Sequence, residues 1–237
     1  IEHHFSLGDG AATFANGVSE LSIGAGARLN HYKAQRENGA AFHLATGAAR
    51  LGAGATYEGF LLTLGARLSR HELRLTLAGA GAEARLSGAY LVRGDQHADT
   101  TTLIDHAVPD CRSNQVFKGV IDGKARGVFQ GKVLVRPDAQ KTDAHQLHRA
   151  LLLSDDARID AKPELEIHAD DVKCCHGATA GDLDEDSMFY LRARGLNRDE
   201  ARALLIGAYV GEAIAEISSE PVRDAFEALA AHWLQAG

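Results

Sequence analysis

Two adjacent cysteines, Cys174 and Cys175, are followed directly by His176. Thiolate is a soft metal donor and neutral imidazole a borderline one, so these residue types suit zinc, copper or an iron–sulfur species. Lys173 precedes them, and its positive charge would favour the thiolate form of a neighbouring cysteine. These side chains are the strongest candidates in the chain for a chemical site.

The backbone around this site predicts how its side chains point. Residues 164–169 alternate polar and apolar types, the period-two pattern of a strand with one buried face. If a strand resumes after Asp171, Cys174 and His176 share one face and Cys175 takes the other. A closed structural zinc site takes four ligands and no C-x-x-C pair occurs, so the ligand set is incomplete within this chain. The alternative is that both cysteines are small buried hydrophobes and the histidine only a hydrogen-bonding group.

Composition indicates a folded chain of 237 residues, long enough for one large domain or one domain with a small appendage. The net charge of −7 and the lack of a long Lys/Arg run argue against nucleic acid or an anionic membrane as the main partner. No apolar run is long enough to cross a bilayer, and no secretory signal is present. The three cysteines are odd in number and unevenly spread, which argues against a disulfide framework and indicates a reducing compartment.

A loose repeat runs through the first part of the chain. The triplet Ala-Arg-Leu recurs with its arginines at positions 28, 50, 67 and 85, separated by glycine-rich corners and short strand-like runs. Self-similarity at about 20 residues is typical of a solenoid, here a parallel β-helix. The alternative is an antiparallel sandwich with regular turns. The sequence starts at Ile1 without methionine, inside a strand-like run, which suggests a fragment of a longer protein.

Other histidines have weaker patterns. His145 and His148 are three apart, a spacing that on a helix would put both on one face. The strand-like run at 150–153 makes a helix doubtful, so both are interpreted as surface or hydrogen-bonding groups. The adjacent pair His3 and His4 has the same interpretation.

After Gly181 the pattern becomes helical. Asp184 can cap a first helix that Gly195 ends, and Asn197 with Glu200 forms a capping box for a second. The second and third helices each carry one apolar stripe: Ala203, Ile206, Val210, Ala213 and Ile217, then Val222, Phe226, Leu229 and Trp233. We expect these stripes to pack the helices together and onto the end of the coil, with part of the surface open to a partner protein. The predicted organisation is a β-helix core at 1–181 and a helical domain at 182–237.

The second half of the chain resembles the SufB/SufD family, the scaffold subunits of the SUF iron–sulfur cluster assembly system. The resemblance rests on a long ordered set of residues: 141–144 (Lys-Thr-Asp-Ala) with Gln146 and Arg149, 151–155 (Leu-Leu-Leu-Ser-Asp), 163–167 (Pro-Glu-Leu-Glu-Ile), 170–174 (Asp-Asp-Val-Lys-Cys), 176–179 (His-Gly-Ala-Thr) and 189–195 (Phe-Tyr-Leu-Arg-Ala-Arg-Gly). The family's N-terminal segment would be absent from this chain.

The chain is similar to the SufD type within that family. The SufB type carries an acidic pair around the histidine, whereas Cys175 and Gly177 flank His176 here. The SufB type also carries a cysteine shortly before the proline of the preceding strand, where Ala157 stands in this chain.

The resemblance implies a right-handed parallel β-helix with a helical C-terminal region that docks the ATPase subunit SufC. It implies pairing with a SufB-type subunit through the last rungs of the coil, where a nascent iron–sulfur cluster forms. His176 is then a cluster ligand, Cys174 a nearby thiol, and Cys175 a residue of doubtful role because relatives often have serine there. The subunit would be no enzyme by itself, would form a homodimer when alone, and would lie in a bacterial cytoplasm.

Two other functions remain open on the residues alone. A β-helix can carry a polysaccharide-cleaving site, although no repeat-spaced cluster of acidic and basic residues is visible. A structural solenoid stabilised by zinc is the other, and metal analysis with chelation would test it.

Overall fold

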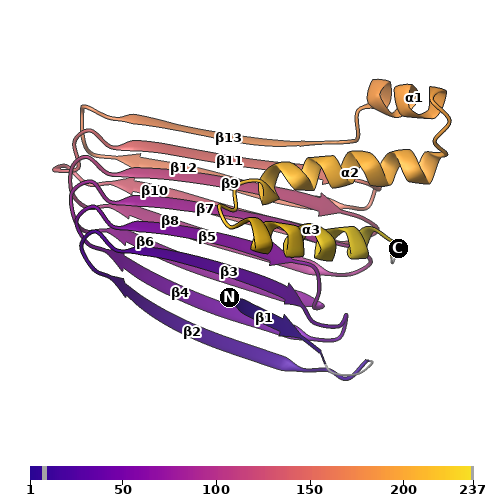
Figure 1. The fold of residues 1–237 in the computed structure, drawn as a ribbon, viewed down its shortest axis with the longest axis horizontal. Coiled ribbons are helices and arrows are strands. Elements are labelled where there is room, and N and C mark those ends of the chain that lie inside the picture. The colour runs from indigo at the N-terminus through magenta and orange to yellow at the C-terminus, as the bar shows by residue number, and fades with distance from the viewer. Residues whose placement is uncertain (7–9, 236–237) are drawn as a thin grey trace.

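The computed structural model describes residues 1–6 and 10–235, in which the strands wind into a solenoid of two facing parallel sheets with helices at the C-terminus (Figure 1). One sheet holds the odd-numbered strands in chain order: β1 (Glu2–Phe5), β3 (Arg28–Arg36), β5 (Thr56–Thr63), β7 (Glu83–Val92), β9 (Arg112–Ile121), β11 (Asp143–Leu152) and β13 (Lys173–Gly181). The other holds the even-numbered strands: β2 (Phe14–Ile23), β4 (Phe42–Leu51), β6 (Leu68–Leu77), β8 (His97–His106), β10 (Arg126–Val135) and β12 (Arg158–Ile167). The predicted parallel β-helix is confirmed.

One turn of the coil is longer than the sequence repeat suggested. Phe42 pairs with Leu68 on the next turn, and Arg126 pairs with Arg158, a wider separation along the chain than the arginine spacing of the Ala-Arg-Leu triplets. The predicted period is too short because each turn contains two strands and two corners. The Ala-Arg-Leu triplets fall at different points of the turn, so their spacing does not measure it.

The glycine-rich corners stack on one another. Gly26, Gly54 and Gly81 have φ angles of 67°, 62° and 73°, which favour glycine because a Cβ atom is strained in this region. Gly26 N–H donates to the carbonyl of Ala53 at 2.8 Å, and Gly54 N–H to that of Ala80 at 2.9 Å. Each corner is therefore hydrogen-bonded to the corner of the next turn.

The interior of the coil is filled by apolar side chains from both sheets. Phe117 and Phe129 face each other across the coil with ring centroids 5.0 Å apart. Other members of this core are fully buried: Leu51, Tyr57, Leu75, Leu77 and Ile104. Alternate residues are buried along β10 and β11, which fixes the register of these strands in the coil.

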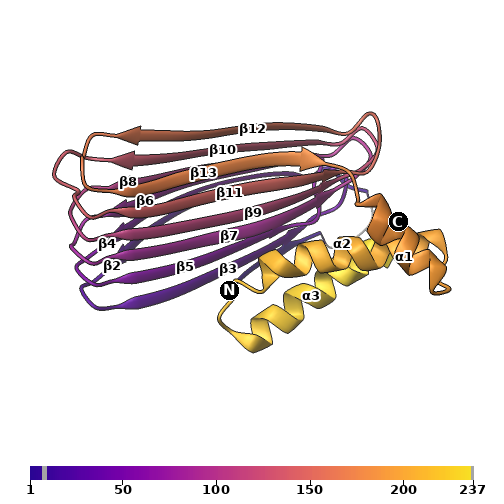
Figure 2. The same cartoon turned by 90° about the horizontal axis from the view of Figure 1, so that it is seen from above.

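The three helices are α1 (Glu185–Ala193), α2 (Arg198–Ile214) and α3 (Glu220–Gln235), of which α2 and α3 lie across the outer face of the odd-numbered sheet (Figures 1 and 2). Their stripes share one core with that face, formed by Tyr32, Phe60, Leu62, Leu91, Val120, Ile206, Val210, Ile214 and Phe226, among others. The prediction that the helices cover the end of the coil is wrong. The sheet is apolar on its outer face at β3, β5, β7 and β9, so this face needs the cover.

The predicted helix ends are confirmed. The Asp184 side chain accepts from Ser187 N–H, and Asn197 and Glu200 form the reciprocal capping box. Gly195 follows α1 with φ of 100°. None of the helices in the described part of the chain combines the length and apolar content needed to cross a membrane.

Candidate functional site

The predicted Cys-Cys-His strand is β13, the last strand of the odd-numbered sheet, and β12 is the last strand of the other sheet. Among residues 1–6 and 10–235, no strand pairs with the outer edge of either (Figure 2). Lys173 N–H donates to the carbonyl of Thr142 at 2.8 Å, so the chain does resume as a strand just after Asp171. The candidate site therefore lies on an open edge at the end of the coil.

Pairing with β11 fixes the direction of each side chain. Cys174 pairs with Ala144 and His176 with Gln146, and both of these partners are buried inside the coil. The alternation predicted from the sequence thus turns Cys174 and His176 toward the interior, with His176 exposed at the open end. Cys175 faces outward.

Cys174 is half-buried and packs on a small core that includes Val133, Val135 and Ala169. Burial raises the pKa of its thiol, and this effect outweighs a backbone hydrogen bond that lowers it. Lys173 is exposed and lies on the opposite face of the strand from Cys174, so its charge does not offset this burial. Coordination to a metal would deprotonate this thiol.

Cys175 has a partner that the sequence did not indicate. His145, on the neighbouring strand β11, has Nδ1 2.9 Å from Cys175 Sγ and Nε2 2.8 Å from Asp143 Oδ1. The interpretation of His145 as a surface hydrogen-bonding group is confirmed. These residues, far apart along the chain, meet because β11 and β13 pair in register, with His145 beside Cys175. A thiol, an imidazole and a carboxylate in a row can move a proton from the sulfur.

Beneath His176, polar side chains continue into the coil. Gln115, Gln146 and His176 occupy matched positions on β9, β11 and β13. The side-chain nitrogen and oxygen of Gln146 are buried and have no hydrogen-bond partner among the described residues. A Cβ atom on Gly131, in the opposite sheet, would overlap Gln146 Nε2, so Gln146 spans the coil and only glycine leaves it room.

His148, in contrast, is a buried structural residue. Its ring stacks on Phe129 with centroids 4.7 Å apart, and Nε2 lies 2.9 Å from the Tyr90 hydroxyl. Burial lowers the pKa of this imidazole to about 4. The interpretation of His148 as a surface or hydrogen-bonding group is confirmed by its hydrogen bond, which lies inside the coil because β11 turns this residue inward.

The strand arrangement brings Cys174 and His176 to one face but adds no third metal-binding side chain to them among the described residues. The group that does offer three ligand atoms, His4, Glu37 and His43, lies at the other end of the coil and was missed by the sequence analysis. Cys174 and His176 thus offer one thiol and one imidazole at the open edge of the coil. All three cysteines are free.

Comparison with known proteins places the chain in a family. Residues 1–209 match the family described as "SUF system FeS cluster assembly, SufBD core domain". An iron–sulfur cluster assembly SufBD family protein of Synechocystis is 45% identical over 204 residues, which cover 86% of this chain and 45% of that protein. The iron–sulfur cluster assembly protein SufD of Escherichia coli is 35% identical over 223 residues, covering 94% of this chain and 52% of that protein.

A SufBD family protein of Mycobacterium tuberculosis is 35% identical over 234 residues, covering 95% of this chain and 59% of its own length. The chain thus spans about half the length of the relatives it matches. The family match extends over both the coil and the first part of the helical region. The chain belongs to the SufBD family of iron–sulfur cluster assembly proteins and is a homologue of SufD.

Proposed function

We propose that the chain is a scaffold subunit of an iron–sulfur cluster assembly complex and pairs with a SufB-type subunit through the open edges of β12 and β13. The observation that carries the proposal is the position of Cys174 and His176 on β13, the last strand of the coil, whose outer edge pairs with no strand in the described part of the chain. Unpaired strand edges present N–H and C=O groups that another chain can bind. Side chains on that edge then face the partner.

In this proposal the nascent cluster is cargo held between the two subunits. His176 supplies a ligand from this side, with Cys174 as an adjacent thiol, and the SufB-type subunit supplies the others. Two ligands on one chain are too few to hold a cluster tightly. Cys175 faces outward with His145, so its role is separate from coordination at the interior face.

The helices supply a docking surface for a SufC-type ATPase. Phe189 and Tyr190 of α1 are 75% and 56% exposed, and Leu204 of α2 is 53% exposed. No residue of α1 is buried, so its apolar side chains are available to a partner. Large exposed apolar groups of this kind mark interaction surfaces.

The contacts of α2 with the sheet can transmit motion of a bound ATPase. Lys118 of β9 contacts the carbonyl of Tyr209 at 3.0 Å and the carboxylate of Glu212. ATP-driven association of two SufC-type subunits would shift these helices and open the interface at the end of the coil.

The subunit itself catalyses no reaction and acts in the cytoplasm. Without a SufB-type partner, it pairs with a second copy through the same edges. The polysaccharide-cleaving alternative has no support from the relatives.

A proline on the open edge tests the pairing. Lys173 N–H points to β11, so by alternation Ala178 N–H points to the open edge. Ala178→Pro removes this N–H but leaves the hydrogen bonds between β13 and β11 in place. Ala178→Ser keeps the N–H and is the matched control. We expect Ala178→Pro, in the full-length protein, to fold but to lose co-purification with the SufB-type subunit, while the serine variant retains it. Equal co-purification of both variants would contradict pairing through β13.

A further inference from the structure

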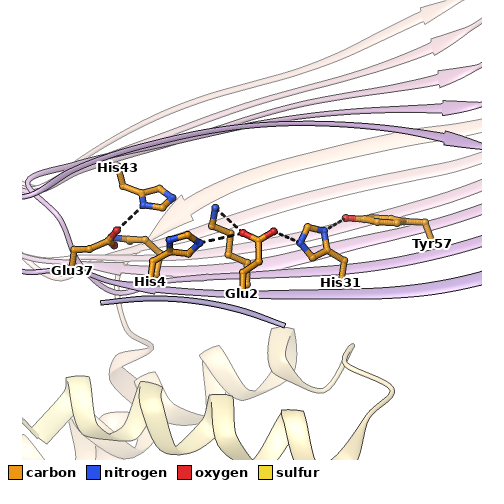
Figure 3. A network of polar contacts seen from close by, with 8 residues as sticks. Glu2, His4, His31, Glu37, His43 and Tyr57 are labelled. Atoms are coloured by element: carbon orange, nitrogen blue, oxygen red, sulfur yellow. Dashed lines mark hydrogen bonds and ion pairs between the residues drawn. The ribbon is translucent and has the colours of Figure 1, made fainter. Parts of the chain in front are cut away.

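The N-terminal end of the coil holds a cavity of about 360 Å³ between the first strands of the two sheets. Its walls are largely apolar, and His4, His43 and His71 line it. Glu37 lies next to His43, as Figure 3 shows. His4 comes from β1, His43 from β4 and His71 from β6, and Glu37 follows β3. This group lies at the opposite end of the solenoid from β13 (Figure 1).

Three of these residues have the geometry of a metal site. One ligand atom each from His4, Glu37 and His43 lies within 4.8 Å of the other two. His43 Nδ1 is 2.7 Å from Glu37 Oε1, and Gln35 donates to the other carboxylate oxygen. Ligands on one zinc or iron ion lie about 3 to 3.5 Å apart. His4 is half-exposed, so its side chain has room to move toward the other two ligands when an ion binds.

Two buried imidazole nitrogens in this cluster have no hydrogen-bond partner among the described residues. They are Nε2 of His43 and Nε2 of His71, whose rings lie 5.0 Å apart. His43 is 1% exposed and His71 is 7% exposed. Leaving a buried polar atom unpaired costs free energy, which a bound ion would offset. The unpaired Nε2 of His71 thus points independently to a ligand, whereas an ion held between Glu37 and His43 Nδ1 leaves Nε2 of His43 unpaired.

His71 lies beside the three ligands. Its ring centroid is 5.0 Å from that of His43, and both residues line the same cavity. His71 is therefore placed to act as a fourth donor.

A second layer of contacts orients His4. Its Nε2 lies 3.2 Å from Glu2 Oε2, which leaves Nδ1 free for an ion, as in other sites where a carboxylate holds a metal-binding histidine.

We propose that His4, Glu37 and His43, with His71 as the fourth donor, bind one divalent first-row transition-metal ion inside the N-terminal end of the coil. Imidazole nitrogens with one carboxylate suit Fe²⁺, Zn²⁺ or Co²⁺, whereas Mg²⁺ and Ca²⁺ require oxygen ligands. The site is independent of the cluster-binding role proposed for β13, because it shares no residue with it.

Metal titration of the full-length protein tests this site. After chelation and removal of the chelator, the protein is titrated without oxygen with Fe²⁺, Zn²⁺ or Co²⁺, with Mg²⁺ for comparison, and calorimetry and Co²⁺ absorption are recorded. We expect one saturable site for each transition metal, no heat with Mg²⁺, and a Co²⁺ spectrum without a thiolate charge-transfer band. The bound metal should also raise Tm.

Variants separate this site from others. Glu37→Gln and His43→Gln should weaken Zn²⁺ binding at least tenfold, and His4→Gln, at a half-exposed position, supplies a variant that keeps the fold. His168→Gln, an exposed histidine outside the cluster, and Cys174→Ala should leave binding unchanged. A site that survives His4→Gln and His43→Gln, a thiolate band with Co²⁺, or the absence of saturable binding would each overturn the proposal.

Discussion

His145 Nδ1 lies 2.9 Å from the sulfur of Cys175, and the other nitrogen of the same ring lies 2.8 Å from Asp143. The contact links β11 and β13 on the outer face of the coil and leaves Cys175 exposed. The two adjacent cysteines therefore have different surroundings: Cys175 contacts a base, whereas Cys174 packs in a core.

The two cysteines should differ in reactivity. We expect iodoacetamide at neutral pH to alkylate Cys175 faster than Cys174, because the first is exposed beside an imidazole and burial raises the pKa of the second. His145→Ala should slow the alkylation of Cys175 several-fold. His168→Ala, which removes an exposed histidine elsewhere, should not change that rate. Mass spectrometry of each peptide over time measures both rates. Equal rates, or no effect of His145→Ala, would contradict the assignment.

Glu58 attaches the helices to the sheet. The side chain is buried and accepts from the Tyr32 hydroxyl at 2.6 Å and from Ser218 N–H at 2.9 Å, in the turn between α2 and α3. We expect Glu58→Ala to lower the free energy of unfolding by about 2 to 4 kcal/mol, because both donors are left without their partner. Urea denaturation measures the change. Glu166→Ala, which removes an exposed ion pair with Lys132, is the control and should leave the free energy of unfolding nearly unchanged.

Gly131 and Gln146 should be energetically coupled across the coil. A Cβ atom at Gly131 would overlap Gln146 Nε2, so Gly131→Ala must displace that side chain. We expect Gly131→Ala to lower the free energy of unfolding by about 1 to 3 kcal/mol. Adding Gln146→Ala to the same protein should restore part of that free energy. Gly17→Ala, where nothing lies within 4 Å, is the control. Additive effects of the two substitutions in a double-mutant cycle would rule out the contact.

Stability should fall as the pH falls from about 6.5 to 4. Burial lowers the pKa values of His106 and His148 to about 4, whereas an unfolded histidine titrates near 6.5. Between these values the unfolded chain binds protons that the folded chain does not, so acid favours unfolding, by up to about 3 kcal/mol for each residue. His148→Gln should flatten the dependence of unfolding free energy on pH. His232→Gln, at an exposed site on α3, should leave the slope unchanged.

Local patterns in the sequence predicted the elements that local physics determines. Asn197 with Glu200 specified the start of α2, and glycine corners such as Gly54 indicated a coil, because caps and left-handed turns depend on a few adjacent residues. Alternation along 173–177 likewise predicted which side chains share the face of His176.

Features that depend on the length of a turn could not be predicted. His145 meets Cys175, and His43 approaches His71, only because about one full turn of the coil separates the members of each pair along the chain. The shorter repeat of the Ala-Arg-Leu triplets concealed both relationships. The position of α2 and α3 was missed for a related reason. The outer apolar face is formed by only one or two residues from each of several strands, such as Leu62 on β5 and Leu91 on β7, and no single strand reveals it.

The cluster content of the purified complex tests the central claim most directly. The full-length protein is co-expressed with its SufB-type and SufC-type partners, purified without oxygen, and analysed for iron, sulfide and visible absorption, with His176→Ala compared against the parent and against His168→Ala. The account predicts that all three complexes form and that cluster content collapses only in His176→Ala. Unchanged cluster content in an intact His176→Ala complex would contradict the role of His176 as a ligand at a shared site.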